Sequence, residues 1–190
     1  MPKLTRDFYL RDDVVQISKE LLGKHLFTKF DGKLTGGIIT ETEAYSGITD
    51  KASHAYGNRR TSRTEVMYHE GGVAYIYLCY GIHSLFNIVT NKKNIPDAVL
   101  IRAIKPTVGI NIMMKRRNKK TNELISGPGT VAQALGMKTI YSGIDLCGSK
   151  IWLEDNEINT ASGKIITSTR IGVAYAEKDA FLPYRFQLIF

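Results

Sequence analysis

The chain has 190 residues, of which 43% are hydrophobic and 23% are charged, proportions that are ordinary for a soluble globular protein. No apolar run approaches the length that crosses a membrane, and two cysteines cannot build a disulfide framework. The formal net charge of +8, with an isoelectric point near 9.4, indicates a polyanionic partner, either nucleic acid or an anionic membrane surface. On charge alone, a basic surface without a partner remains open.

The cysteines and histidines bear on metal and redox chemistry. Cys79 and Cys147 lie far apart in apolar company, and no histidine lies at a ligand spacing from another histidine or from a cysteine. We therefore expect no metal and no cofactor. The charged first residues are unlike a secretory signal, so we expect a soluble, intracellular protein (in cytoplasm or nucleoid, or in the nucleus if eukaryotic) without a membrane partner. Nothing resembles a heptad repeat or an apolar docking face, so we expect a monomer.

The first third of the chain predicts a helix, a hairpin and a long loop. Asp13 is placed to cap a helix over residues 14–22, and Gly23 suits its end. Two apolar strands, 25–30 and 33–45, flank Asp31-Gly32, a pair typical of a tight hairpin turn. Residues 46–70 are predicted to be mostly loop, and a loop of this length inside a compact domain is usually functional.

The rest of the chain is richer in strands than in helices. A second hairpin is predicted at 73–90 around Tyr80-Gly81, and a strand at 97–104. Pro106 is expected to introduce a helix with a basic end, and Gly127-Pro128-Gly129 a short helix that Gly136 stops. The remaining strands are expected at 150–155, 164–176 and 184–190. We predict one α+β domain, residues 1–190, around a mixed, mainly antiparallel sheet.

The strand over 38–45 carries the first candidate catalytic group. Because side chains alternate along a strand, Glu41, Glu43 and Tyr45 share one side. A glutamate among apolar strand residues is costly unless it is paired or used. A solvent-facing carboxylate on an edge strand, or an ion pair with an arginine, remains open for Glu43. If the His54 loop folds back over it, an ionised Glu43 could deprotonate a water molecule.

Tyrosines and basic residues surround this strand in sequence. Tyr75 and Tyr77 share a face, and a tyrosine-rich strand face is more often core than ligand site. Tyr80 at the turn is different, because an exposed rigid ring can push into a duplex and fill the gap left by an extruded base. The basic groups suit phosphate contacts, although each alone is typical of a solvated surface. They are Arg59, Arg60, Arg63, Lys92, Lys93, Lys115, Arg116, Arg117, Lys119 and Lys120. Together these groups predict a site for chemistry on a nucleotide.

A set of collinear motifs makes the chain resemble the alkyladenine DNA glycosylase family (3-methyladenine DNA glycosylases of the alkylpurine type). A single short match would be weak, but these motifs follow one another over almost the whole chain. They are ETEAY (Glu41–Tyr45), the His54 loop, RRTSR (Arg59–Arg63), the tyrosine strand with Tyr80-Gly81 and Asn87, LIRAIKP (Leu100–Pro106), GPG and ALG within Gly127–Gly136, TRIGVAYA (Thr169–Ala176) and PYRF (Pro183–Phe186).

The resemblance implies a monofunctional enzyme that removes N-alkylated purines from double-stranded DNA, on a single domain with a curved sheet flanked by helices. Glu43 would activate the water, and Arg102 would lie near that water and the target phosphate. The flipped base would be bound by Tyr45, His54, Tyr77 and Asn87, with Asn87 screening purines by a clash with an exocyclic amine. Tyr80 would intercalate, and Arg59 and Arg63 would contact the DNA backbone.

Three other functions remain open from the sequence. A non-catalytic damaged-DNA-binding protein would use Tyr80 and the basic groups for affinity alone. A bifunctional glycosylase and lyase would need a nucleophilic lysine such as Lys51. A hydrolase of free glycosides would need two carboxylates, for which Glu41 and Glu43 are available, although the basic surface argues against it. Local departures from the family pattern, at Thr130 and over His83–Phe86, bear on substrate range rather than on the chemistry.

Overall fold

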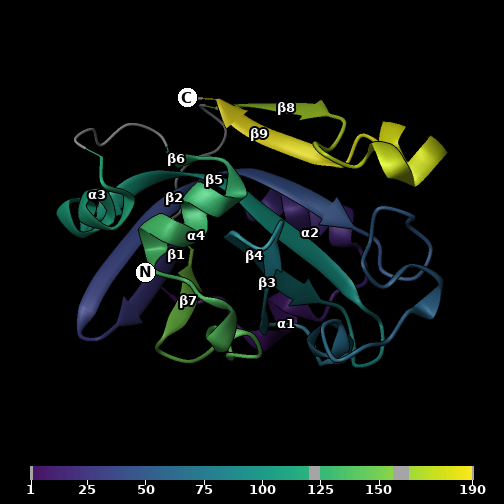
Figure 1. Cartoon of the computed structure of the whole chain (residues 1–190), viewed down its shortest axis with the longest axis horizontal. Helices are drawn as coiled ribbons and strands as arrows, with labels where there is room; N and C mark the ends of the chain where they lie inside the picture. Colours follow the sequence, from purple (N-terminus) through teal and green to yellow (C-terminus); the bar gives the residue numbers. More distant parts are fainter. Residues whose placement is uncertain (1, 120–124, 156–162, 190) are drawn as a thin grey trace.

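The computed structural model describes residues 2–119, 125–155 and 163–189. Its helices are short, and two of its strands are much longer than any helix (Figure 1). The helices are α1 (Arg6–Tyr9), α2 (Val14–Glu20), α3 (Ile110–Arg117) and α4 (Pro128–Leu135), with 3-10 turns η1 (Tyr56–Asn58), η2 (Glu65–Tyr68), η3 (Thr139–Tyr141) and η5 (Ala174–Phe181). The strands are β1 (His25–Phe30), β2 (Lys33–Tyr45), β3 (Ala74–Cys79), β4 (His83–Thr90), β5 (Asp97–Val108), β6 (Ile125–Ser126), β7 (Ile151–Glu154), β8 (Lys164–Ser168) and β9 (Arg185–Ile189).

One sheet joins the strands of the described residues, and its neighbours pair antiparallel throughout. Its main path is β3-β4-β5-β2-β1-β7, and the hairpin of β8 and β9 joins through β2. Along one edge, β2 pairs first with β1 and then, over Glu41–Glu43, with β9. Its other edge pairs with β5, with register shifts around Glu41. The predicted α+β fold with a mainly antiparallel sheet is confirmed.

The local signals explain most of these elements. Asp31 and Gly32 both adopt positive φ, as the two-residue turn between β1 and β2 requires. The Asp13 carboxylate accepts a hydrogen bond from the Gln16 amide at 2.8 Å and caps α2. Gly136 takes the left-handed conformation that ends α4. The hairpin, the capped helix and the glycine stop are therefore confirmed.

Two expectations were wrong. Pro106 does not end the strand before it, because β5 continues to Val108 and α3 starts only at Ile110. Pro106 pairs with Gly37 beside a register shift, where the ladder tolerates a residue without an amide hydrogen. The strand expected over 164–176 ends at Ser168. Beyond it the backbone turns toward β2, where the Ile171 amide donates to a side chain instead of to a neighbouring strand. The expected basic helix end includes Lys120, which lies outside the described residues.

The apolar core gathers side chains from α2, α4 and the middle of the sheet, with Ile17, Leu26, Phe86, Ile101 and Leu135 all fully buried. A smaller cluster that includes Met67, Tyr68 and Tyr75 supports the 46–70 segment, which extends beyond the end of β2 (Figure 1). No helix in the described ranges has both the length and the apolar character needed to span a bilayer.

Thr42 anchors β2 to the helix beneath it. Its hydroxyl donates to the Ser18 carbonyl at 2.8 Å and accepts from the Ser18 hydroxyl at 3.0 Å, and all these groups are buried. Since side chains alternate along a strand, this bond fixes Thr42 toward α2 and leaves Glu41 and Glu43 on the opposite face.

We expect Thr42→Val to lower the free energy of unfolding by about 1–3 kcal/mol, because it leaves the buried Ser18 hydroxyl without its partner. Thr40→Val is the matched control, since the Thr40 hydroxyl is buried and makes no hydrogen bond within the described residues. That control should be neutral or slightly stabilising. Urea denaturation of both variants measures the difference, and equal losses would contradict the anchoring role.

Candidate active site

Glu43 lies in the middle of the sheet, between Leu100 of β5 and Arg185 of β9, and its side chain is fully buried. One carboxylate oxygen, Oε1, accepts from the Ile171 amide at 2.8 Å and lies 3.4 Å from Arg102 Nε. The other, Oε2, accepts from the Tyr45 hydroxyl at 2.8 Å. Burial raises the pKa of Glu43, while Arg102, the Ile171 amide and the Tyr45 hydroxyl each oppose that rise. The carboxylate is thus held in one orientation.

Glu41 shares the face of Glu43, and two arginines balance the pair. Glu41 Oε1 accepts from Arg102 Nε at 3.0 Å and from Arg185 Nε at 2.6 Å. Arg102 therefore lies between the two carboxylates. The ion pair that the sequence left open for Glu43 is present, but Arg102 is closer to Glu41 than to Glu43. In this cluster, two carboxylates face two guanidinium groups.

A second buried ion pair, Asp50 with Arg170, holds the backbone beside Glu43. Both side chains are inaccessible to solvent, and both terminal nitrogens of Arg170 contact the Asp50 carboxylate. Arg170 also donates to the carbonyls of Ala44 and Asp179 at 3.0 Å, and its guanidinium lies 4.8 Å from the centre of the Tyr45 ring. Because Ile171 follows Arg170, this pair places the amide that binds Glu43.

An aromatic pocket lies next to Glu43. Tyr45 connects the two, because its side chain lines the pocket and its hydroxyl donates to the Glu43 carboxylate. Its lining comprises Tyr45, Ala52, Ser53, His54, Met67, Tyr75, Tyr77, Asn87, Ala98 and Tyr175. His54 Nδ1 lies 2.9 Å from the Tyr75 hydroxyl, and the His54 ring meets Tyr77 edge-on at 4.6 Å. Asn87 is buried and donates to the Tyr75 carbonyl at 3.2 Å. The structure therefore gathers Tyr45, His54, Tyr77 and Asn87, residues up to 42 positions apart in the chain, in one pocket.

The charge of His54 is set by its surroundings. Burial, followed by the positive charges of Arg63 and Arg59, lowers the pKa of His54 to about 4. The imidazole is therefore neutral at pH 7. Arg63 lies over the Tyr77 ring at 4.9 Å, with Nη2 3.4 Å from His54 Nε2.

Tyr80 stands at the tip of the hairpin between β3 and β4. Its side chain is 90% exposed, and both Tyr80 and Gly81 have positive φ, which turns the chain sharply.

Arg60 differs from its neighbours Arg59 and Arg63, because its guanidinium is bound by the Glu65 carboxylate at 2.7 and 2.8 Å. Within the described ranges, Arg59 and Arg63 have no carboxylate partner, so their charges face the surface above the pocket.

Lys51 lies outside the cluster around Glu43. Its ammonium group is 2.5 Å from the Glu177 carboxylate, which raises the pKa of Lys51. A lysine held protonated in this way is a poor nucleophile at neutral pH.

Sequence reasoning missed Asp50, Arg170, Tyr175 and Arg185. Arg170 and Arg185 fall within the quoted motifs TRIGVAYA and PYRF, and their charge among apolar neighbours was the available signal. Asp50 gave none, since its partner is 120 residues away. No three His, Cys, Asp or Glu side chains gather into a metal site anywhere in the ranges that the structure describes.

The raised pKa of Glu43 has a consequence for stability. A carboxyl whose pKa is higher in the folded than in the unfolded state contributes fully below the unfolded value, about 4.3, and loses that contribution as the pH rises through the folded value. Glu43→Gln stays neutral, so its free energy of unfolding should gain on that of wild type as the pH rises from about 4.3 through the raised pKa of Glu43, by about 1.4 kcal/mol for each unit of pKa elevation.

Urea denaturation across this pH range measures the effect. Glu65→Gln is the control of opposite sign, because the hydrogen bond from Arg60 lowers the pKa of the exposed Glu65. A pH-independent difference between Glu43→Gln and wild type would contradict the proton linkage.

Similarity to known proteins extends over nearly the whole chain. A family model described as methylpurine-DNA glycosylase matches residues 7–189. A protein of Chlamydia felis is 50% identical over 188 residues, covering 97% of this chain and 95% of that protein. One from Clostridium novyi is 42% identical over 197 residues, covering 99% and 96%. Both carry the name "Putative 3-methyladenine DNA glycosylase". The chain therefore belongs to the methylpurine-DNA glycosylase family, as its motifs predicted.

Proposed function

We propose that this protein removes an N-alkylated purine, such as 3-methyladenine, from duplex DNA by hydrolysing its N-glycosidic bond and leaving an abasic site. The observation that carries this proposal is the fully buried Glu43 carboxylate, held by the Ile171 amide and the Tyr45 hydroxyl, next to an aromatic pocket. The names of the relatives support the choice of lesion. A buried, costly carboxylate beside a pocket is typical of a catalytic group.

Glu43 acts as the general base. A water molecule gives its proton to Glu43 as its oxygen bonds to the anomeric carbon, and the base leaves with the electrons of the glycosidic bond. Alkylation on a ring nitrogen makes the base cationic, so it departs as a neutral molecule and needs no acid. The positive charge that develops on the sugar is stabilised by Glu43 and Glu41. Arg102, between the two carboxylates, orients Glu43 and the water.

The pocket holds the flipped base. Tyr45 and Tyr77 offer electron-rich faces, which attract a cationic ring more strongly than a neutral one. His54 contacts the base in its neutral form. Asn87, fixed by its bond to the Tyr75 carbonyl, clashes with an exocyclic amine at a ring position where 3-methyladenine has none, such as the 2-amino group of guanine, and so screens against unmodified guanine.

The surface around the pocket holds the DNA. Tyr80 enters the duplex and fills the space of the extruded base, which offsets part of the few kcal/mol that unstacking costs. Arg59 and Arg63 contact phosphates. A non-catalytic binding protein would use this surface equally well, but it has no use for a buried, hydrogen-bonded Glu43. The paired Lys51 favours a monofunctional enzyme over a lyase.

Base release tests the proposal directly. We expect wild type to release 3-methyladenine from a duplex with one lesion under single-turnover conditions, and Glu43→Gln to release it about 10²–10⁴-fold more slowly with DNA binding retained. Glu65→Gln, at an exposed glutamate outside the pocket, should match wild type. Binding without release by all three proteins would leave a damage-binding module and would remove Glu43 from catalysis.

The pH dependence tests the role of Tyr45. Because Glu43 must be ionised, kcat/KM should fall as the pH drops through its raised pKa, with a midpoint above the usual value of about 4.3. The Tyr45 hydroxyl bond lowers the pKa of Glu43, so Tyr45→Phe should move this midpoint to higher pH. Tyr184→Phe, which lies near Arg170 but not on Glu43, should leave it unchanged. Identical midpoints in all three proteins would exclude Glu43 as the titrating base.

A further inference from the structure

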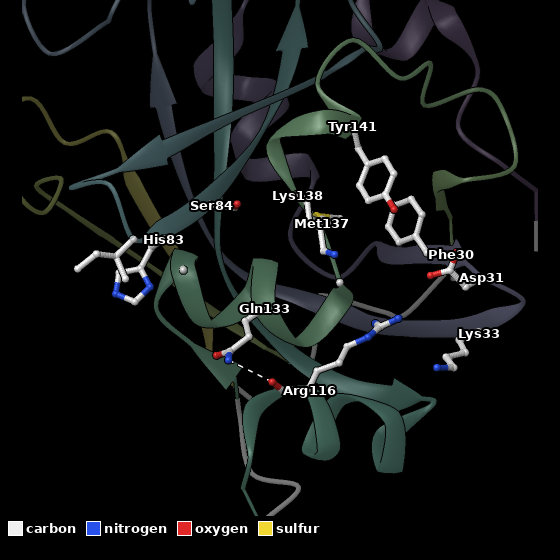
Figure 2. Close-up of a pocket in the computed structure, with 13 residues that line it drawn as sticks. Phe30, Asp31, Lys33, His83, Ser84, Arg116, Gln133, Met137, Lys138 and Tyr141 are labelled. Atoms are coloured by element: carbon white, nitrogen blue, oxygen red, sulfur yellow. Dashed lines mark hydrogen bonds between the residues drawn. The ribbon is translucent and has the colours of Figure 1, made fainter.

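A basic groove runs along α4, away from the aromatic pocket. Its cavity of about 550 Å³ is lined by Phe30, Asp31, Lys33, Ile82, His83, Ser84, Arg116, Gly129, Gln133, Gly136, Met137, Lys138 and Tyr141. Figure 2 shows His83 and Ser84 at one end, with Phe30, Asp31 and Lys33 at the other, and Arg116 between them. We call this cavity the α4 groove. Neither the catalytic residues nor the base-binding residues line it.

Positive charge dominates the α4 groove. Of the described residues that line it, Lys33, Arg116 and Lys138 are cationic and Asp31 alone is acidic. Within the part of the chain that the structure describes, none of the three cations forms an ion pair with a carboxylate. Among the described residues, Arg116 makes side-chain hydrogen bonds only through Nη1, which donates to the Ala134 carbonyl at 3.0 Å and to the Thr35 hydroxyl at 3.2 Å. Within the same ranges, its Nε and Nη2 have no acceptor, so they can donate to an anion from outside.

The groove begins where the intercalating turn ends. Ile82 and His83, which follow Tyr80-Gly81, form its near end, and His83 lies directly against Gly129 at the start of α4. From there it follows α4 to Gly136 and Lys138. Eight helical residues span about 12 Å, which is the rise of about four base pairs. A duplex that receives Tyr80 therefore needs only a short flank to reach the far lysines.

We propose that the α4 groove binds the phosphate backbone of the duplex on one side of the lesion. This inference rests on the proposed function, and it adds a second phosphate-binding surface to the DNA interface proposed for Arg59 and Arg63. The groove contacts phosphates through Lys33, Lys138 and the free donors of Arg116, so it contributes affinity without reading sequence. Its charge and its continuity with the Tyr80 turn favour DNA over an acidic peptide or a small phosphorylated molecule.

The salt dependence of binding to undamaged duplex tests this, because it needs no base release. Each lost phosphate contact lowers the slope of log K against log salt by about 0.9. Lys33→Gln/Lys138→Gln should therefore flatten the slope by about 2 relative to wild type. Lys29→Gln/Lys164→Gln, with the same loss of charge, should keep the wild-type slope. Lys29 neighbours Phe30 on β1 but projects from the opposite face of the sheet, and Lys164 lies on β8.

A second measurement locates the contact along the DNA. Two duplexes carry one lesion analogue, and the flank on one side or the other is cut to about two base pairs, which is shorter than the groove. The affinity gap between wild type and Lys33→Gln/Lys138→Gln should persist with one duplex and vanish with the other. Equal slopes for both double variants, or a gap that is unchanged in both duplexes, would overturn the proposal. Absence of base release by wild type would instead defeat the proposed function and leave these slopes interpretable.

Discussion

The rest of the structure depends on one constraint, the burial of the Glu43 carboxylate inside a strand that is paired on both edges. An ionised group there is not hydrated by bulk solvent, so the protein must supply its hydrogen-bond partners. Arg102 comes from β5, the hydroxyl of Tyr45 from the same strand, and the Ile171 amide from a segment 128 residues later. The register of β2 and β5 shifts on both sides of Glu41, so that Glu41 pairs with Ala103 and Thr42 with Ile101, and Arg102 between these partners lies within 3.4 Å of both carboxylates.

The Asp50–Arg170 pair holds the distant segment that contains Ile171 in place beside Glu43. Its charges are both excluded from solvent, a situation that stabilises a fold little by itself but is strongly destabilising when one partner is lost. Its role here is to fix the position of the segments that it joins. Arg170 joins the 46–70 segment to the backbone before Ile171 and lies against the Tyr45 ring, so the same guanidinium supports a donor to Glu43 and a wall of the pocket. The positions of the pocket wall and of the Glu43 carboxylate therefore depend on the same ion pair.

Local chemistry made much of this fold predictable. The Asp31-Gly32 turn, the Asp13 cap and the Tyr80-Gly81 tip each require particular residues, and alternation along β2 placed Glu41, Glu43 and Tyr45 together. The predictions that were wrong concern segments whose structure depends on partners far away in sequence. Pro106 is tolerated in β5 only because Gly37 lies beside an irregular pairing, and residues 169–176 leave the sheet because Asp50 and Glu43 bind them. Tyr75 is buried, as is usual for a tyrosine-rich strand face, yet it also lines the pocket together with Tyr77, and strand periodicity alone places both on one face.

The proposed function makes two opposite electrostatic demands on the protein: a positive surface to bind phosphates and a pocket without excess positive charge. A net charge of +8 attracts phosphates, but under the proposed function further positive charge in the pocket would repel a cationic base. Next to the pocket, the carboxylates of Glu41 and Glu43 balance the charges of Arg102 and Arg185. An ordinary histidine, with a pKa of about 6.5, would still be partly protonated near neutral pH. Burial and the neighbouring Arg63 and Arg59 keep His54 neutral instead, so the two arginines also remove a positive charge from the pocket wall.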